Sequence, residues 1–253
     1  MSLLDHVIFL LCVALATGAQ TLTGFAFGLV LLGLTSVLAI APLVEVTNVI
    51  SILVLANLAA LFARRRPVLA KPQLLPAVAA SLLCVPLGVW LLHRFSADAA
   101  MALQMLLGAT ILGCALLLGA RSRPFAQVSG AGPFAAVGAL SGVLGGLFSA
   151  SGPPIVYLFY RQPLPLDTIR HSLVVLFAAN SLWRLLLMVK DGAFTLTTVW
   201  MSLQAIPVVI ATTWLVQRYG PIQSVRLVRR LVLLLLAAAG LGLLGQGAAG
   251  FLR

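Results

Sequence analysis

Apolar residues follow one another along nearly the whole chain and are interrupted only by short polar connectors. A stretch of about 20 apolar residues is long enough for an α-helix to cross a bilayer. The connectors hold Pro42, Pro67, Pro72, Pro124, Pro163, Pro165 and Pro221. The pattern predicts a polytopic, all-α integral membrane protein with segments at about 4–22, 25–41, 44–63, 74–92, 99–119, 133–147, 152–160, 171–190, 196–216 and 228–248.

Composition and charge support this class. Hydrophobic residues make up 62% and charged residues 8% of the chain, which excludes a soluble domain of this length. The net charge of +11 does not indicate nucleic-acid binding, because the basic residues gather in short loops, as the positive-inside rule describes. The loops expected in the cytoplasm contain Arg64, Arg65, Arg66, Lys71, Arg121, Arg123, Arg161, Arg170, Arg218, Arg226, Arg229 and Arg230. The ends and loops expected outside contain Asp5, Glu45, Asp98 and Asp191, with Arg94, Lys190 and Arg253.

This charge distribution constrains how often the chain crosses the membrane. Residues 133–160 begin and end on the side of the basic loops, so they must form a hairpin of two segments. Residues 4–41 are too long for one span and form the opposite hairpin; their acidic N-terminal end indicates a retained span rather than a signal peptide. We expect about eight to ten membrane segments in two inverted repeats, with a first repeat over 1–120, a cytoplasmic linker over 121–132 and a second repeat over 133–253.

Two of the apolar segments cannot stay helical throughout. In the second half, Gly145 and Gly146 loosen the helix, and the run Ser151-Gly-Pro-Pro154 breaks and restarts it. A similar glycine-interrupted segment, 18–28, lies 124 residues earlier. Unwound backbone at membrane depth is tolerated only where it is buried in protein or lines a cavity. Paired breaks in two inverted halves predict the binding site of a transporter.

The restarted helices predict an anionic ligand. Ser151 is suited to be the N-cap of the second helix, which would begin inside the membrane with free N–H groups and the positive end of its dipole. Such a helix end binds anions. The candidate substrate ligands are Gln20, Thr21, Thr23, Gly24, Phe25, Gly28, Asn57, Gly145, Gly146, Ser149, Ser151, Gly152, Pro153, Asn180 and Arg184. The alternative role for each polar side chain is a structural hydrogen bond to a neighbouring helix.

Arg184 is the ionisable residue that lies well inside a predicted span. One interpretation is that its side chain reaches the lipid headgroups at the nearby outer end of the span. The other is a buried cation that attracts or gates an anionic substrate. Asn180 lies one helical turn earlier on the same face, which favours the buried cation.

A glycine stripe lies in the segment before the second break. Gly138, Gly142 and Gly146 recur every four residues and therefore share one face of a helix. Small residues at this spacing let two membrane helices approach closely. We expect a second helix to pack against this face.

Other function classes fit the chain less well. An intramembrane serine hydrolase would need a base beside its serine, yet the three histidines lie at predicted span ends. The three cysteines lie singly in apolar spans, and their spacing suits neither disulfides nor a metal site. We therefore expect no enzyme activity, no metal and no cofactor. An anion channel is the main alternative, although paired breaks favour alternating access.

Both breaks carry a family resemblance. The run Gly142-Val-Leu-Gly-Gly-Leu-Phe-Ser-Ala-Ser-Gly-Pro-Pro154 closely resembles the second-half signature of the TauE/SafE sulfite exporter family. The run Gln20-Thr-Leu-Thr-Gly-Phe-Ala-Phe-Gly28 is similar to the first-half signature, with Ala26 where glycine is frequent. Pro86-Leu-Gly88 inside a span and the arginine cluster at 64–66 also fit, so the resemblance covers essentially the whole chain.

The resemblance implies a transporter of the cell inner membrane that exports, or in some members takes up, small anions. Sulfite and organosulfonates are the usual substrates of the family. Transport would be coupled to a gradient of protons or of another ion. The implied partners are the lipid bilayer and the anionic substrate, without nucleic acid; an oligomer is compatible with this architecture.

Overall fold

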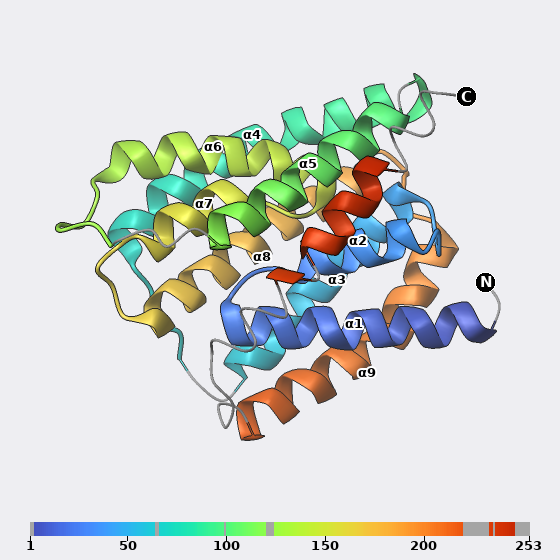
Figure 1. Ribbon diagram of the computed structural model, residues 1–253, viewed down its shortest axis with the longest axis horizontal. Helices are drawn as coiled ribbons and strands as arrows, with labels where there is room; N and C mark the ends of the chain where they lie inside the picture. Colours follow the sequence, from blue (N-terminus) through green and yellow to red (C-terminus); the bar gives the residue numbers. More distant parts are fainter. Residues whose placement is uncertain are drawn as a thin grey trace.

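The computed structural model of the chain describes residues 3–63, 66–98, 100–119, 124–219, 233–234 and 236–245. Regular structure within these ranges is entirely helical (Figure 1). The helices are α1 (Leu3–Thr23), α2 (Phe27–Val37), α3 (Leu43–Phe62), α4 (Lys71–Asp98), α5 (Ala100–Gly119), α6 (Ala131–Phe148), α7 (Gly152–Tyr160), α8 (Leu166–Lys190), α9 (Leu196–Tyr219) and an apolar C-terminal helix, Leu236–Gly245. The predicted all-α fold is confirmed.

Six helices of the described ranges are long and apolar enough to cross a membrane, namely α1, α3, α4, α6, α8 and α9. Their outward surfaces carry large apolar side chains, such as Leu83 on α4 and Leu203 on α9. By contrast, α2 and α7 have 11 and 9 residues and are too short to span a bilayer, since a helix rises about 1.5 Å per residue. The chain is therefore a multi-pass membrane protein that contains two half-length helices.

The two hairpin breaks occur where they are expected, after Thr23 and after Phe148. The structure differs at the beginning of two long helices. Pro72 was expected in a connector, but it lies in the first turn of α4, where the missing N–H of proline leaves no hydrogen bond unmade. Similarly, α8 begins directly after Pro165, its N-cap residue. Both helices begin earlier than predicted because proline is compatible with a helix start.

The glycine stripe of α6 packs directly on the backbone of α4. A Cβ atom built on Gly142 would lie 2.2 Å from the carbonyl oxygen of Ser81. The same atom on Gly138 or Gly146 would lie 2.4 or 2.3 Å from a carbonyl oxygen of α4. The predicted close approach of two helices at these glycines is confirmed, and its partner is α4.

The half-length helices lie inside the bundle. Eight residues of α2 are buried, and α5 packs beside α7. The C-terminal helix covers α2, where a Cβ on Gly33 would lie 2.7 Å from the Cβ of Ala239. Likewise, α1 packs on α9 and α6 on α4 (Figure 1). Paired contacts of this kind are those expected from two inverted repeats; the repeats and their boundaries stay predictions.

Part of the predicted charge pattern lies outside the described residues. This holds for Arg64, Arg65, Arg121, Arg123, Pro221, Arg226, Arg229, Arg230 and Arg253. The same is true of the first residues of the span expected at 228–248, whose described part is helical over Leu236–Gly245. The cytoplasmic location of the basic loops stays a prediction.

Candidate functional site

The first break separates α1 from α2 by a turn with left-handed backbone. Gly24 has a φ of 78° and Ala26 a φ of 80°, values that residues other than glycine rarely adopt. A Cβ on Gly24 would lie 2.6 Å from the Cα of Arg170 on α8. The backbone carbonyl of Thr23 accepts a hydrogen bond from the Tyr160 hydroxyl at 2.5 Å. The first break is thus held in place by α7 and α8 of the second half.

The second break is formed by the residues between α6 and α7. Ser149 ends α6 with a φ of 53°, and Ser151 is the N-cap residue of α7. The predicted capping bond is absent, since the Ser151 hydroxyl bonds no backbone N–H of α7. Pro153 and Pro154 occupy the first turn, so the N-terminus of α7 offers fewer backbone donors than expected. The start of α7 after Ser151 was therefore predicted correctly, but the capping role of the Ser151 hydroxyl was not.

The two breaks are in direct contact. A Cβ on Gly28 of α2 would lie 2.9 Å from the carbonyl oxygen of Ser149 and 3.0 Å from the Cβ of Ala150. A Cβ on Gly152 would lie 2.9 Å from a methyl carbon of Leu29. The second break can approach the first turn of α2 this closely because position 28 is glycine, and Gly152 leaves room for the Leu29 side chain.

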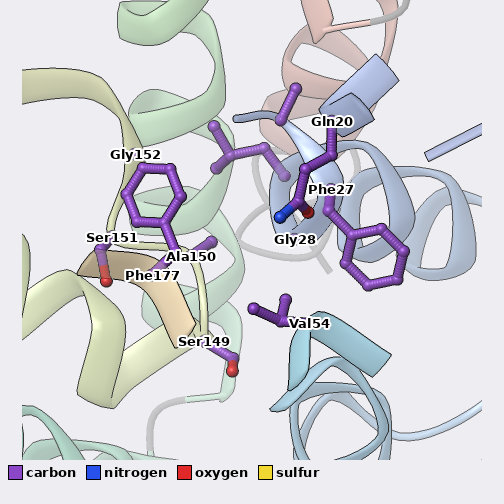
Figure 2. A pocket seen from close by; sticks show the side chains of 11 residues that line it. Gln20, Phe27, Gly28, Val54, Ser149, Ala150, Ser151, Gly152 and Phe177 are labelled. Carbon is purple, nitrogen blue, oxygen red and sulfur yellow. The ribbon is translucent and has the colours of Figure 1, made fainter. Parts of the chain in front are cut away.

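A pocket lies where the two breaks meet (Figure 2). Its walls come from α1, α2, α3, α8 and the α6–α7 break. The lining residues are Gln20, Ala26, Phe27, Gly28, Leu29, Val54, Ser149, Ala150, Ser151, Gly152 and Phe177. Apolar side chains dominate, with a few polar groups among them, as in typical small-molecule sites.

Gln20 supplies an unpaired donor to this pocket. Its side chain is only 1% exposed, and its Nε2 atom has no hydrogen-bond partner among the described residues. Figure 2 shows the Gln20 amide turned into the space beside Gly28, across from Ser151. A buried donor without an acceptor destabilises a fold by about 1–3 kcal/mol. An acceptor from a ligand would remove this penalty.

The first turn of α2 adds backbone donors. Phe27, Gly28 and Leu29 are the first three residues of this helix, and the N–H groups of a first turn have no partner within their own helix. All three residues line the pocket. The first turn of α2 therefore has more free backbone N–H groups than the first turn of α7, which contains two prolines; anion binding at these helix ends stays a prediction.

Asn180 holds the second break from behind. Its Nδ2 donates to the Ser151 hydroxyl at 2.9 Å, and its Oδ1 accepts from the Ser81 hydroxyl at 2.8 Å. Gly145 makes room for this arrangement, because a Cβ there would lie 2.3 Å from the Ser151 Oγ. Asn180 therefore connects α4 and α8 to the beginning of α7.

The Arg184 side chain is buried inside the protein and does not reach its surface. Its side chain is 0% exposed, so the expectation that it reaches the headgroups is wrong. The guanidinium donates from Nε to the Gly146 carbonyl at 3.0 Å. Its other contacts are Nη1 to the Thr47 carbonyl (3.2 Å), Asn48 Oδ1 (3.0 Å) and Ser51 Oγ (3.1 Å), and Nη2 to Thr47 Oγ1 (2.8 Å). These acceptors are all neutral, and no ion pair joins Arg184 to any described residue.

Ser51 connects this buried cation to the pocket. Its Oγ lies 2.7 Å from the Oγ of Ser149, which lines the pocket. Sequence reasoning missed Ser51, and it also missed Thr47, which shares the hydrogen-bonding network. Two hydroxyls four residues apart in a mostly apolar span share one helix face, and this spacing was the available signal.

The pocket brings together some of the predicted residues and leaves others outside. Those lining it are Gln20, Gly28, Ser149, Ser151 and Gly152. Those that do not line it are Thr21, Thr23, Gly24, Phe25, Asn57, Gly145, Gly146, Pro153, Asn180 and Arg184. Asn57 donates to Thr213 at 2.9 Å and to Thr21 at 3.5 Å. These are hydrogen bonds to neighbouring helices, the alternative role given above for each polar side chain. Three further lining residues, Ala26, Phe27 and Ala150, lie within the two predicted break segments but were not singled out as ligands, and sequence reasoning missed Leu29, Val54 and Phe177.

Comparison with known sequences identifies the family of this chain. The family model described as "Sulfite exporter TauE/SafE" matches residues 9–243. A protein of Cupriavidus necator, named "Probable sulfite/organosulfonate exporter TauE", is 36% identical over 225 residues, which cover 89% of this chain and 88% of that protein. No solved structure matches the chain. Because the family model extends over both breaks and nearly all membrane helices, the chain belongs to the TauE/SafE sulfite exporter family and is a membrane transporter.

Proposed function

We propose that this transporter exports sulfite or small organosulfonates and binds them in the pocket between the two breaks. The observation that carries the assignment of the site is the buried Gln20 amide, whose Nε2 faces the pocket and has no partner in the described part of the chain. The substrate class follows from the relative in Cupriavidus necator, whose name describes a sulfite/organosulfonate exporter.

The donors around the pocket suit a sulfur oxyanion. Gln20 provides an N–H, the first turn of α2 provides backbone N–H groups, and Ser149 and Ser151 provide hydroxyls. A sulfite or sulfonate group presents three oxygen acceptors around one sulfur. Donors arriving from both breaks would bind different oxygens of the same group, so the anion would join the two halves.

Arg184 would set the charge preference of the site. The charge of a buried guanidinium is screened much less than that of a surface residue. Since Arg184 has no ion-pair partner among the described residues, its charge remains available to a nearby anion. An anion in the pocket would therefore be stabilised and a cation destabilised.

Movement of the anion would follow from the two inverted halves. Each half contributes a half-length helix to the same pocket, so rocking of one half against the other would expose the pocket first to one side and then to the other. Export would be coupled to a gradient of protons or of another ion. Titration of flux against imposed gradients identifies that ion, and the mass of the detergent-solubilised protein establishes whether it forms oligomers.

The test is sulfite efflux from loaded proteoliposomes, measured with and without a pH gradient. We expect gradient-dependent flux in the wild type and none in Gly152→Leu, whose larger side chain would fill the space beside Leu29. Gly113→Leu is the matched control, because a Cβ on Gly113 meets no atom within 4 Å. Normal flux in a well-inserted Gly152→Leu protein would reject the site. Channel-like rates that ignore the gradient would instead support an anion channel.

A further inference from the structure

We propose that Ser51 is a positioning residue of the substrate site. Held by Arg184, it directs the Ser149 hydroxyl so that the hydrogen atom of this hydroxyl points to the ligand. The inference rests on the proposed anion site and identifies a specificity-determining residue of that site. A short hydrogen-bond chain from Arg184 through Ser51 to Ser149 sets this direction.

The chain begins at a group that can only donate. An arginine guanidinium has five N–H donors and no acceptor, so the 3.1 Å contact between Arg184 Nη1 and Ser51 Oγ has one direction. It occupies one lone pair of the Ser51 oxygen. The single hydrogen of the Ser51 hydroxyl must then go elsewhere.

Two acceptors lie within reach of that hydrogen. The Thr47 carbonyl is 3.0 Å from Ser51 Oγ, and Ser149 Oγ is 2.7 Å away. The Thr47 carbonyl already accepts from Arg184 Nη1 at 3.2 Å. As the residue four positions earlier in α3, it also accepts the backbone N–H of Ser51. Nη1 has two hydrogens for three acceptors, so its bond to the Thr47 carbonyl is shared. The Ser51 hydrogen competes with two other donors at the Thr47 carbonyl and, among the described residues, with none at Ser149 Oγ, so the shorter bond to Ser149 is the favoured one.

This direction determines what Ser149 offers the pocket. Once the Ser149 oxygen accepts from Ser51, the hydrogen of Ser149 remains unused, because Ser51 is the one partner of the Ser149 hydroxyl within the described residues. Ser149 lines the pocket. The ligand therefore meets a donor whose direction is set by a buried cation. Such a site favours an unprotonated oxyanion over a neutral acid or ester.

The neighbouring serine lacks this fixed direction. Ser151 is held by the amide of Asn180, whose other side contacts Ser81. An asparagine amide carries a donor and an acceptor and can turn over. The Ser151 hydroxyl can therefore donate or accept in response to the ligand. Of the two hydrogen-bond chains, only the one through Ser51 begins at a group that can donate but cannot accept, namely the Arg184 guanidinium.

A double-mutant cycle on the full-length protein in detergent tests the proposal. Dissociation constants for sulfite and for methanesulfonate are measured by calorimetry in the wild type, Ser51→Ala, Ser149→Ala and the double variant. When Ser149 is present, we expect Ser51→Ala to weaken binding about fivefold, which corresponds to the loss of one hydrogen bond. In the Ser149→Ala background the same change should have no effect, because Ser51 acts on the ligand through Ser149.

Two further variants separate positioning from packing. Ser202→Ala removes a buried hydroxyl that donates only to its own helix, at Thr198, and should leave the dissociation constants unchanged. Ser51→Cys keeps a side chain of similar size but has a weaker hydrogen-bond donor. It should weaken binding when Ser149 is present. If Ser51→Ala lowers the melting temperature sharply, Ser51→Cys replaces it in the cycle.

The possible outcomes distinguish the two proposals. Equal weakening by Ser51→Ala in both backgrounds, or no weakening in either, would overturn the role of Ser51. Binding with the expected cycle but no export flux would reject the proposed function and support the role of Ser51. Failure of the wild-type protein to bind either anion would overturn both.

Discussion

Gly28 and Ser149 bring the two halves of this transporter into contact. The Cα of Gly28 approaches so closely that a Cβ there would lie 2.9 Å from the carbonyl oxygen of Ser149. Gly28 lies in the first turn of α2, and Ser149 lies in the break between α6 and α7. The pocket therefore exists only while two breaks that are more than 100 residues apart remain side by side.

The first prediction concerns this contact. Gly28→Val should abolish anion binding, because the branched side chain would meet backbone atoms rather than a side chain that can move. Binding of sulfite to the purified protein is the measurement, and Gly113→Val, whose side chain enters open space, is the control. Unchanged affinity in a folded Gly28→Val protein would contradict the placement of the pocket.

The second prediction separates stability from binding at Gln20. Gln20→Leu removes the unpaired Nε2, so the anion-free protein should be more stable by about 1–3 kcal/mol. The same change removes a ligand donor and should weaken sulfite binding. Melting temperature without anion and calorimetric titration with sulfite measure the two effects. A variant that melts earlier and binds normally would show that the amide has only a structural role.

The third prediction concerns Arg184. Arg184→Lys should lose transport although it keeps the charge, because an ammonium has three donors and cannot reproduce the planar contacts to Gly146, Thr47 and Ser51. Arg184→Met should also lose transport, since it removes the charge. Sulfite flux and melting temperature are measured for both variants. Wild-type flux in Arg184→Met would show that no buried cation is needed.

The fourth prediction concerns strain at Ala26. This residue has a left-handed φ of 80°, which disfavours an L-residue by roughly 1–2 kcal/mol. Ala26→Gly should therefore raise the melting temperature while sulfite binding is retained. Ala41→Gly, in the connector before α3, is the comparison and should not stabilise the protein. A lower melting temperature for Ala26→Gly would contradict the strained turn.

The fifth prediction concerns membrane orientation. In a cysteine-free background, Val68→Cys and Tyr219→Cys should react with an impermeant maleimide only from the cytoplasm, because their loops are rich in basic residues. Leu196→Cys, at the other end of α9, should react only from outside. All three side chains are exposed. Labelling of position 68 and position 219 from opposite sides would reject the inverted repeats.

The breaks could be predicted because their causes are local. Glycine and proline change backbone preference at their own positions, so the ends of α1 and α6 followed from Gly24 and from the run at 151–154. The glycine stripe at Gly138 and Gly142 also predicted that another helix packs closely against α6. That this partner is α4 could not be predicted, since many apolar helices offer a similar surface.

The sequence by itself determined an all-α membrane protein, two broken hairpins and the family to which it belongs. Apolar length, helix breakers and motif residues act along the chain and are visible there. Only the tertiary structure decided that Arg184 is buried and that Ser51 lies between it and Ser149. Those partners are 98 to 133 residues apart, and hydrogen bonds over such separations depend on which helices pack together rather than on local preference.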